Sequence, residues 1–222
     1  LFAFTQDPIA IGCDILLVNG KIIDGTGNSW YYGNIAVKDG KIMAIGRDLN
    51  LSTKKTIDAK GLIIAPGFID VHTHLEDDEK RDPNATNFIL DGVTTCVTGN
   101  CGSSNTDIGK YFNYIDSLKL SINVATLIGH NDVRKAVMGR ANRDATTEEM
   151  KRMEDIVDKA MKDGAVGLST GLIYIPGTYT KTPEIIALAK VVSGYKGLYA
   201  SHMRDEGDSI TQAIEEALTI GR

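Results

Sequence analysis

From Leu62 to the end of the chain, short β-branched runs alternate with segments whose apolar residues recur at helical spacing. We expect five successive strands, at residues 62–71, 92–98, 121–127, 165–169 and 197–201. Helices are expected between and after them, including residues 84–91 and 107–120. A helix between two strands forms a right-handed crossover, so this alternation predicts an α/β fold with a parallel sheet. The run at residues 68–71 is apolar enough to predict a buried strand.

Three of the later helices have predicted N-terminal caps. Thr146 with Glu149 matches a capping box ahead of the helical pattern over residues 150–161. Thr182 is expected to cap a helix that has Pro183 at its first position. The last helix is expected to begin with a capping box, formed by Ser209 and Gln212.

The first sixty residues follow a different pattern. Short β-branched runs are separated by Asn19-Gly20 and Asp39-Gly40, and both pairs are typical of hairpin turns. We expect a small antiparallel sheet at residues 1–61, with a strand that ends at Asn19-Gly20 and a further short strand at residues 56–59. The chain is therefore expected to consist of this N-terminal β module and an α/β part over residues 62–222.

The charge and hydropathy of the chain exclude some classes of binding partner. The chain has 24 Lys and Arg against 29 Asp and Glu, a net charge of −5, and no basic patch, so we expect no nucleic-acid partner. No apolar run reaches the ~18 residues of a membrane span. Residues 1–4 (LFAF) fit two interpretations, a remnant of a signal peptide in an exported protein or the start of a fragment of a cytoplasmic protein.

Histidine and cysteine residues follow three of the predicted strands. His72 and His74 come at the end of the first strand, where residues two apart face the same side. Cys101 lies between glycines after the second strand, and His202 follows the fifth. Neutral imidazole and thiolate are common zinc ligands, and sites in barrel folds are assembled from several strand ends. This pattern predicts a metal site.

Other polar residues are weaker candidates. His130 follows the third strand and is expected to line the pocket rather than bind metal, and Asp70 is expected to hold the strand end beside the histidines. Tyr174 and Arg204 are candidates for contact with an anionic small-molecule substrate. Cys13 and Cys96 are expected to be small buried apolar residues.

The residues alone leave two architectures open, a doubly wound sheet and a (β/α) barrel. No Gly-x-Gly-x-x-Gly motif follows the first strand, so a dinucleotide site is not supported. Only five strands are predicted, whereas a complete barrel has eight strands and about 250 residues.

Four segments resemble a known family. They are PGFIDVHTH (66–74), GVTTCVTGNCG (92–102), GAVGLSTGL (164–172) and YASHMRDE (199–206). The first is similar to the first-strand signature of the amidohydrolase superfamily, and together they resemble the N-acyl-D-amino-acid deacylases, or D-aminoacylases. The resemblance runs from about Asp14 to Arg222. It implies the first part of a (β/α)8 TIM barrel, incomplete at Arg222, preceded by a contribution to a small β-sandwich.

The resemblance also implies a mechanism. His72, His74, Cys101 and His202 would bind Zn²⁺, and a zinc-activated water would cleave a linear amide to give a carboxylate and a free D-amino acid. The general-base aspartate of the family is expected after Arg222, so we expect no catalytic base within residues 1–222 and no deacylase activity from these residues alone. Where the family often has Asp two residues after the histidine pair, this chain has Glu76.

Two other functions are compatible with such a fold. Cyclic-amide hydrolases of the dihydropyrimidinase or dihydroorotase type use a carboxylated lysine at the end of the fourth strand, where this chain has Ser169-Thr170-Gly171. A scaffold protein without activity would have lost ligand residues, whereas the four candidates are present here. The deacylase interpretation is therefore the better supported of the three.

Overall fold

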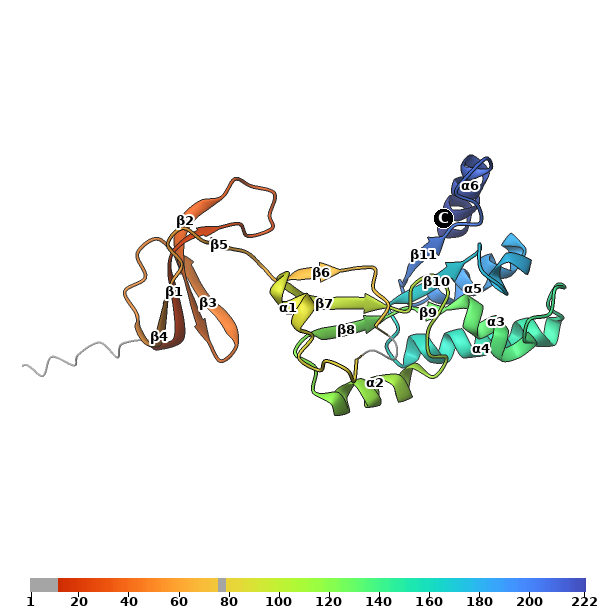
Figure 1. Cartoon of the computed structure of the whole chain (residues 1–222), viewed down its shortest axis with the longest axis horizontal. Helices are drawn as coiled ribbons and strands as arrows, with labels where there is room; N and C mark the ends of the chain where they lie inside the picture. Colours follow the sequence, from red (N-terminus) through yellow and green to blue (C-terminus); the bar gives the residue numbers. More distant parts are fainter. Residues whose placement is uncertain (1–11, 76–78) are drawn as a thin grey trace, which may run out of the picture. The chain divides into compact units, whose positions relative to one another are not determined.

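A computed structural model of the chain describes residues 12–75 and 79–222. The chain divides into two compact units, Leu1–Pro66 and Gly67–Arg222 (Figure 1). The segment LFAF and the position Glu76, both singled out from the sequence, lie outside the described residues. Within those residues, no helix has the length and apolar character needed to cross a membrane.

The first unit is built on a five-stranded sheet. Its strands are β1 (Gly12–Ile22), β2 (Tyr31–Lys38), β3 (Lys41–Gly46), β4 (Ser52–Asp58) and β5 (Ile63–Ile64). The order is β3-β2-β1-β4, and β5 also pairs with β1. The β1–β2 and β2–β3 pairs are antiparallel, whereas β4 and β5 run parallel to β1.

The prediction of an antiparallel sheet over residues 1–61 is therefore wrong for β4. The prediction of one strand over residues 62–71 in the α/β part is also wrong, because Ile63–Ile64 pairs with β1 as β5 and only Phe68–Asp70 forms β6. The connection over residues 47–51 packs Leu49 and Leu51 against a small core formed by Cys13, Leu16 and Ala36. After this crossing the chain pairs with the free side of β1 instead of forming another hairpin. Cys13 is buried, as predicted.

The two predicted hairpin turns differ in outcome. Asp39-Gly40 joins β2 to β3 with positive φ angles of 50° and 71°, which is the backbone that a tight hairpin requires. Asn19-Gly20 lies inside β1, so the predicted strand end there is wrong. Asn19 instead forms a bulge with φ 61°; its N–H donates to Asn34 Oδ1 and its side-chain amide to Asp58 Oδ1, on the two neighbouring strands.

The second unit alternates strands and helices, as predicted from the sequence pattern. Its strands are β6 (Phe68–Asp70), β7 (Val93–Thr98), β8 (Asn123–Thr126), β9 (Ile128–Gly129), β10 (Gly167–Gly171) and β11 (Leu198–His202). All pairs in the β6-β7-β8 and β9-β10-β11 sheets are parallel. The Val166 N–H donates to the Thr126 carbonyl at 2.9 Å and connects the two sheets. The carboxyl ends of these strands consequently meet along one edge.

In the described residues, six α-helices follow or separate these strands. They are α1 (Thr86–Leu90), α2 (Ile108–Leu118), α3 (His130–Met138), α4 (Thr147–Lys162), α5 (Thr182–Ser193) and α6 (Ile210–Gly221). The apolar faces of α3 and α5 pack against β10 and that of α4 against β9, in the main core, which includes Met153, Val157, Leu168 and Leu188. Of the six helices, α3 was not predicted. Cys96 is fully buried in a second cluster, as predicted for a small apolar side chain.

One predicted helix cap is confirmed and two are wrong. Thr146 and Glu149 form the reciprocal hydrogen bonds of a capping box at α4. At α5 the cap residue is Lys181, because the Thr182 hydroxyl donates to Glu216 instead. At α6 Ser209 is the N-cap residue, but its side chain makes no cap bond, and Asp205 rather than Gln212 accepts its backbone N–H, so the predicted capping box is not formed.

The prediction of a buried first strand is also wrong. Phe68 and Ile69 of β6 remain about 60% exposed, at 60% and 63%. β6 is an edge strand that pairs with β7 alone, and no helix of this unit covers it among the described residues.

A buried ionic network connects α3 to α5. His130 Nε2 lies 3.1 Å from Glu184 Oε1, and the Arg134 guanidinium bonds Glu184 Oε2. Burial raises the pKa of the Glu184 carboxyl, but the hydrogen bonds from His130 and Arg134 outweigh burial, and the pKa lies below its ordinary value. Arg134 also donates to the carbonyls of Ala141 and Arg143. The network therefore holds α5, α3 and the loop after α3 together.

We predict that Glu184→Gln lowers the free energy of unfolding by about 3–5 kcal/mol, because Arg134 then keeps a buried charge without a counter-charge. Urea denaturation followed by circular dichroism measures this. Glu215→Gln, an exposed glutamate of α6, is the matched control and should change stability by less than about 0.5 kcal/mol. Equal stability of the two variants would contradict the role assigned to the network.

A second prediction concerns the α4 cap. Bidentate hydrogen bonds from Arg143, together with the Thr146 N–H, lower the pKa of Glu149 from 4.5 to about 2. A lowered pKa means that this stabilisation is complete above pH 4.5 and is lost as the pH falls from 4.5 to about 2. Carboxyl ¹³C NMR should find Glu149 titrating near 2, and Arg143→Gln should raise that pKa. Arg152→Gln on the same helix should not change it.

Candidate metal centre

The two first-strand histidines project from an anchored strand end. The Asp70 carboxylate accepts the backbone N–H of His72, as expected for a residue that holds this end. Between the histidines, buried Thr73 bonds the Val97 carbonyl through both its N–H and its hydroxyl. With Thr73 fixed toward β7, His72 and His74 both face the other way, and their ring centroids lie 5.4 Å apart.

Cys101 lies in a tight turn after β7 that is fastened to β10. Cys101 has a φ of 54°, between Gly99 and Gly102 at 76° and 78°. The buried Ser169 hydroxyl donates to the Gly99 carbonyl at 2.5 Å and accepts the Gly102 N–H at 3.0 Å. This clamp directs the thiol to the strand ends. Burial, together with the negative charge of Glu206, raises the pKa of the Cys101 thiol.

The four predicted ligand residues come together at this edge. Cys101 Sγ lies 3.6 Å from both His72 Nε2 and His202 Nδ1. The donor atoms of His72, His74 and Cys101 all lie within 4.8 Å of one another. His202 ends β11 and lies on the Cys101 side of this group, with Glu206 3.3 Å from its Nε2. Three strand ends thus supply one cluster.

The chemistry of these donors suits zinc. Imidazole nitrogen and thiolate sulfur are its common ligands, with bond lengths of about 2.0–2.1 Å and 2.3 Å and tetrahedral angles. Those values place a nitrogen and a sulfur on one zinc ion about 3.6 Å apart, which is the separation observed between Cys101 Sγ and two of the histidines. The residues present can therefore hold such an ion.

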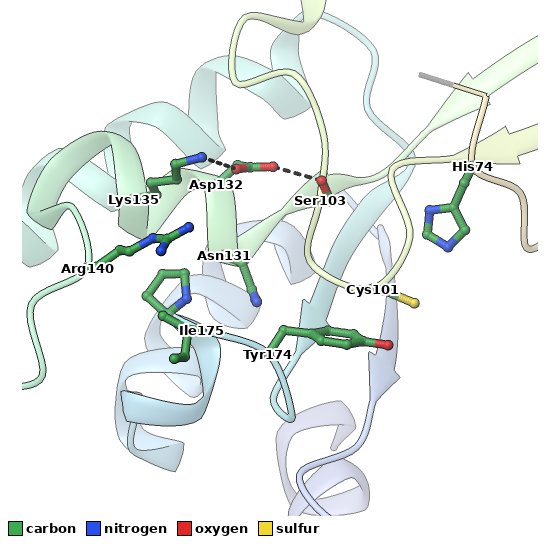
Figure 2. Close-up of a pocket in the computed structure, with 10 residues that line it drawn as sticks. His74, Cys101, Ser103, Asn131, Asp132, Lys135, Arg140, Tyr174 and Ile175 are labelled. Carbon is green, nitrogen blue, oxygen red and sulfur yellow. Dashed lines mark hydrogen bonds and ion pairs between the residues drawn. The ribbon is translucent and has the colours of Figure 1, made fainter. Parts of the chain in front are cut away.

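A cavity of about 330 Å³ opens beside the cluster. His74 and Cys101 lie at one side of it, and Tyr174 forms part of its wall (Figure 2). The Tyr174 hydroxyl lies 3.3 Å from His202 Nδ1, and the two rings meet edge-on at 4.7 Å. Tyr174 thus lies between the cavity and the histidine of β11.

Two sequence candidates have structural roles instead. His130 is fully buried and contacts Glu184, so it does not line the cavity as expected. Arg204 makes two hydrogen bonds to Glu216 and two to the carbonyls of Thr178 and Thr180. The Arg204 guanidinium therefore makes its hydrogen bonds within the protein and is not presented to an anionic substrate.

Sequence reasoning missed several cavity residues, among them Asn131 and Lys135 of α3 and Arg140 of the loop after it. Asn131 is buried, and its amide both donates to the Gly171 carbonyl and accepts the Gly171 N–H, which connects α3 to β10. Lys135 and Arg140 line the same cavity. A polar residue directly after a buried histidine was the available signal for Asn131, whereas exposed Lys and Arg have no distinctive pattern.

Comparison with known proteins identifies close relatives. Residues 55–208 match the sequence model of the amidohydrolase family. The chain is 38% identical to a D-aminoacylase of Alcaligenes xylosoxydans xylosoxydans, over 94% of this chain and 48% of that protein. It is 36% identical to an N-acyl-D-aspartate deacylase of the same organism, over 98% of this chain and 49% of that protein.

A solved structure gives the same result. The crystal structure of an N-acyl-D-glutamate deacylase from Bordetella bronchiseptica, complexed with zinc and a phosphonate mimic of the tetrahedral intermediate, superposes with a TM-score of 0.90 at 37% identity. The match covers 95% of this chain and 49% of that one. The chain therefore spans about half the length of each of these three relatives.

The turn that positions Cys101 generates a prediction. A Cβ added at Gly102 would lie 2.2 Å from Asn131 Oδ1 and 2.7 Å from the Gly171 nitrogen. Gly102→Ala should therefore destabilise the protein by about 2–5 kcal/mol, the sum of left-handed backbone strain and steric overlap. Gly40→Ala is the control, because Gly40 has a similar φ of +71° with nothing within 4 Å, and should cost about 1–2 kcal/mol. Equal losses in urea denaturation would show that the packing around Gly102 contributes nothing.

Proposed function

The chain belongs to the amidohydrolase family, and from that premise we propose that it forms the metal-binding part of a zinc-dependent deacylase. This enzyme hydrolyses the linear amide of N-acyl-D-amino acids to a carboxylate and a free D-amino acid. The observation that carries the proposal is the convergence of the donor atoms of His72, His74, Cys101 and His202 from three strand ends. The names of the relatives favour N-acyl-D-amino acids as the substrate class.

We propose that the fold completes two larger structures. The parallel strands are the first five of a (β/α)8 barrel, with β8 and β9 as two parts of the third strand; their uninterrupted sequence order supports this. The N-terminal sheet, β5 included, contributes to a composite β-sandwich, and the barrel part begins at β6. In the N-terminal sheet Ile42 is 63% exposed and Ile45 42%, and both line an apolar cavity of about 290 Å³. An apolar sheet face of this kind is suited to cover by further strands.

Each ligand has a distinct origin in the fold. His72 and His74 hold the zinc ion from the end of β6, Cys101 from the turn after β7, and His202 from the end of β11. When bound, zinc supplies Lewis-acid chemistry that lowers the pKa of water and polarises an amide carbonyl. The protein contributes a rigid setting, because the Ser169 clamp and the Thr73 anchor hold the donors before any metal arrives.

Tyr174 is the proposed substrate contact. Its hydroxyl lies 3.3 Å from the His202 ring and its side chain forms part of the cavity wall. A phenol at this point can donate to an oxygen of the bound amide while its ring shields the site from water. No residue within 1–222 is assigned as the general base.

The cyclic-amide alternative has less support. Enzymes of that type use a carboxylated lysine at the fourth strand, and β10 has the sequence GLSTG with no lysine. The position near the histidines is instead occupied by the Cys101 thiol. A scaffold without activity is also disfavoured, since all four donors are present in contact distance of the cluster.

We predict that Cys101→Ala weakens zinc binding at least about 100-fold, because loss of even an outer partner of a ligand weakens metal affinity 10–100-fold. Zinc content after dialysis against a weak chelator measures this. Substitution of zinc by Co²⁺ gives a second readout, since a thiolate–Co²⁺ absorption band should be present in the wild type and absent in the variant. Cys13→Ala, which removes a buried cysteine of the other unit, should change neither.

The same variants test the activity. The protein at its natural length should release D-amino acids from N-acetyl-D-amino acids, and Cys101→Ala should lose this activity while Cys13→Ala keeps it. Unchanged zinc content and turnover in Cys101→Ala would overturn the ligand assignment. Hydrolysis of dihydroorotate or a hydantoin, with no release of D-amino acids, would favour the cyclic-amide alternative.

A further inference from the structure

Two basic side chains, Lys135 and Arg140, line the cavity that contains His74 and Cys101. In Figure 2 they lie on the side of the cavity opposite these two candidate ligands. We propose that Arg140, assisted by Lys135, binds a carboxylate of the substrate while the amide to be cleaved lies beside the metal centre. This inference rests on the proposed function and narrows its substrates to anions bound at this wall.

The charge on the wall differs in sign from that of the whole chain. The chain has a net charge of −5, whereas among the described residues that line the cavity the charged ones are Lys135, Arg140 and a single acid, Asp132. Asp132 is already engaged, since its carboxylate accepts the Ser103 hydroxyl at 3.0 Å and the Ser104 N–H at 3.1 Å. Lys135 Nζ lies 4.0 Å from the other carboxylate oxygen of Asp132, Oδ1. The wall is therefore net positive and attracts anions.

Arg140 is the cation available to a ligand. Within the described parts of the chain, no hydrogen bond or ion pair occupies its guanidinium. The neighbouring Arg143, in contrast, binds both oxygens of Glu149 at 2.7 Å. A guanidinium presents parallel N–H donors that match the two oxygens of a carboxylate, so Arg140 is suited to bidentate binding.

The backbone of the loop that contains Arg140 is bonded to a buried side chain of the core. Arg134 is fully buried, is paired with Glu184, and donates to the carbonyls of Ala141 and Arg143 on the C-terminal side of Arg140. The Arg140 backbone is thus fixed to the core, while its side chain is exposed in the cavity. Such a support lowers the entropy lost when a ligand is bound.

The cavity also has a suitable size and lining. A volume of about 330 Å³ lies at the lower end of small-ligand sites, which measure about 300–1,000 Å³. Tyr174, Ile175 and Pro176 form a mainly apolar wall between the metal cluster and the basic residues (Figure 2). A small acylated amino acid can therefore contact both ends at once, with its carboxylate at Arg140.

The first test needs no turnover. Isothermal titration of the zinc-loaded protein compares glutarate, which has two carboxylates, with butyrate, which has one. We expect glutarate to bind about tenfold or more tightly than butyrate, the preference typical of one additional charge-assisted pair. In Arg140→Gln this preference should fall to about twofold or less. The control Arg152→Gln, an exposed arginine of α4 outside the cavity, should retain it.

The second test identifies which carboxylate is bound. kcat/KM is measured for N-acetyl-D-leucine and N-acetyl-D-glutamate with the wild type, Arg140→Gln and Arg152→Gln. A loss in Arg140→Gln for both substrates means that the wall binds the α-carboxylate, and a loss for the glutamate substrate alone means that it binds a second carboxylate. Unchanged kcat/KM for both substrates, or a glutarate preference that is absent in the wild type or survives in Arg140→Gln, would overturn the proposal.

The two proposals can fail separately. If the protein cleaves no N-acyl amino acid but prefers glutarate through Arg140, the deacylase function is wrong and the carboxylate site stands. If it cleaves these substrates equally well with Gln at position 140, the deacylase function stands and the carboxylate site is wrong.

Discussion

The candidate metal centre depends on two hydrogen bonds made by the Ser169 hydroxyl. The hydroxyl donates to the Gly99 carbonyl and accepts the Gly102 N–H, and so ties the turn after β7 to the middle of β10. β7 and β10 belong to different sheets, and the Ser169 hydroxyl bonds the turn after β7 directly to β10. Because β11 pairs with β10, the same connection sets the separation of Cys101 and His202.

A second buried support acts on the other side of the cavity. Glu184 of α5 binds His130 and Arg134 of α3, and Arg134 extends the network to the loop after α3. Asn131 on the same helix bonds Gly171 at the end of β10. The N-terminal half of helix α3 is thereby fixed to α5 and to the end of β10. The candidate metal cluster and the basic wall are consequently both positioned by buried polar contacts near the strand ends.

The sequence was sufficient for features governed by local spacing. The His-x-His pair, the cysteine between glycines and the histidine after the fifth predicted strand lie together because carboxyl ends of parallel strands share one edge. The Thr146–Glu149 cap and the Asp39-Gly40 turn were likewise determined within four residues.

Features that depend on distant partners could not be predicted in this way. Asn19-Gly20 has the composition of a hairpin turn, yet hydrogen bonds to Asn34 and Asp58 keep it inside β1. Thr182 has the composition of a cap, yet its hydroxyl donates to Glu216, 34 residues away. His130 resembled a pocket residue because it follows a strand end, and only the position of Glu184 shows that it faces the core.

The candidate metal cluster and the basic wall are held in place in different ways, and this difference affects the specificity for substrates. The metal cluster is held by backbone geometry, through positive φ angles and contacts that leave no room for a Cβ at Gly102. The basic wall is held differently, since Arg134 binds main-chain carbonyls of the loop and does not engage the Arg140 side chain. A substitution at position 140 therefore alters the charge of the cavity without disturbing the loop or the metal ligands. In such an arrangement the preference for a substrate can change while the metal chemistry stays the same.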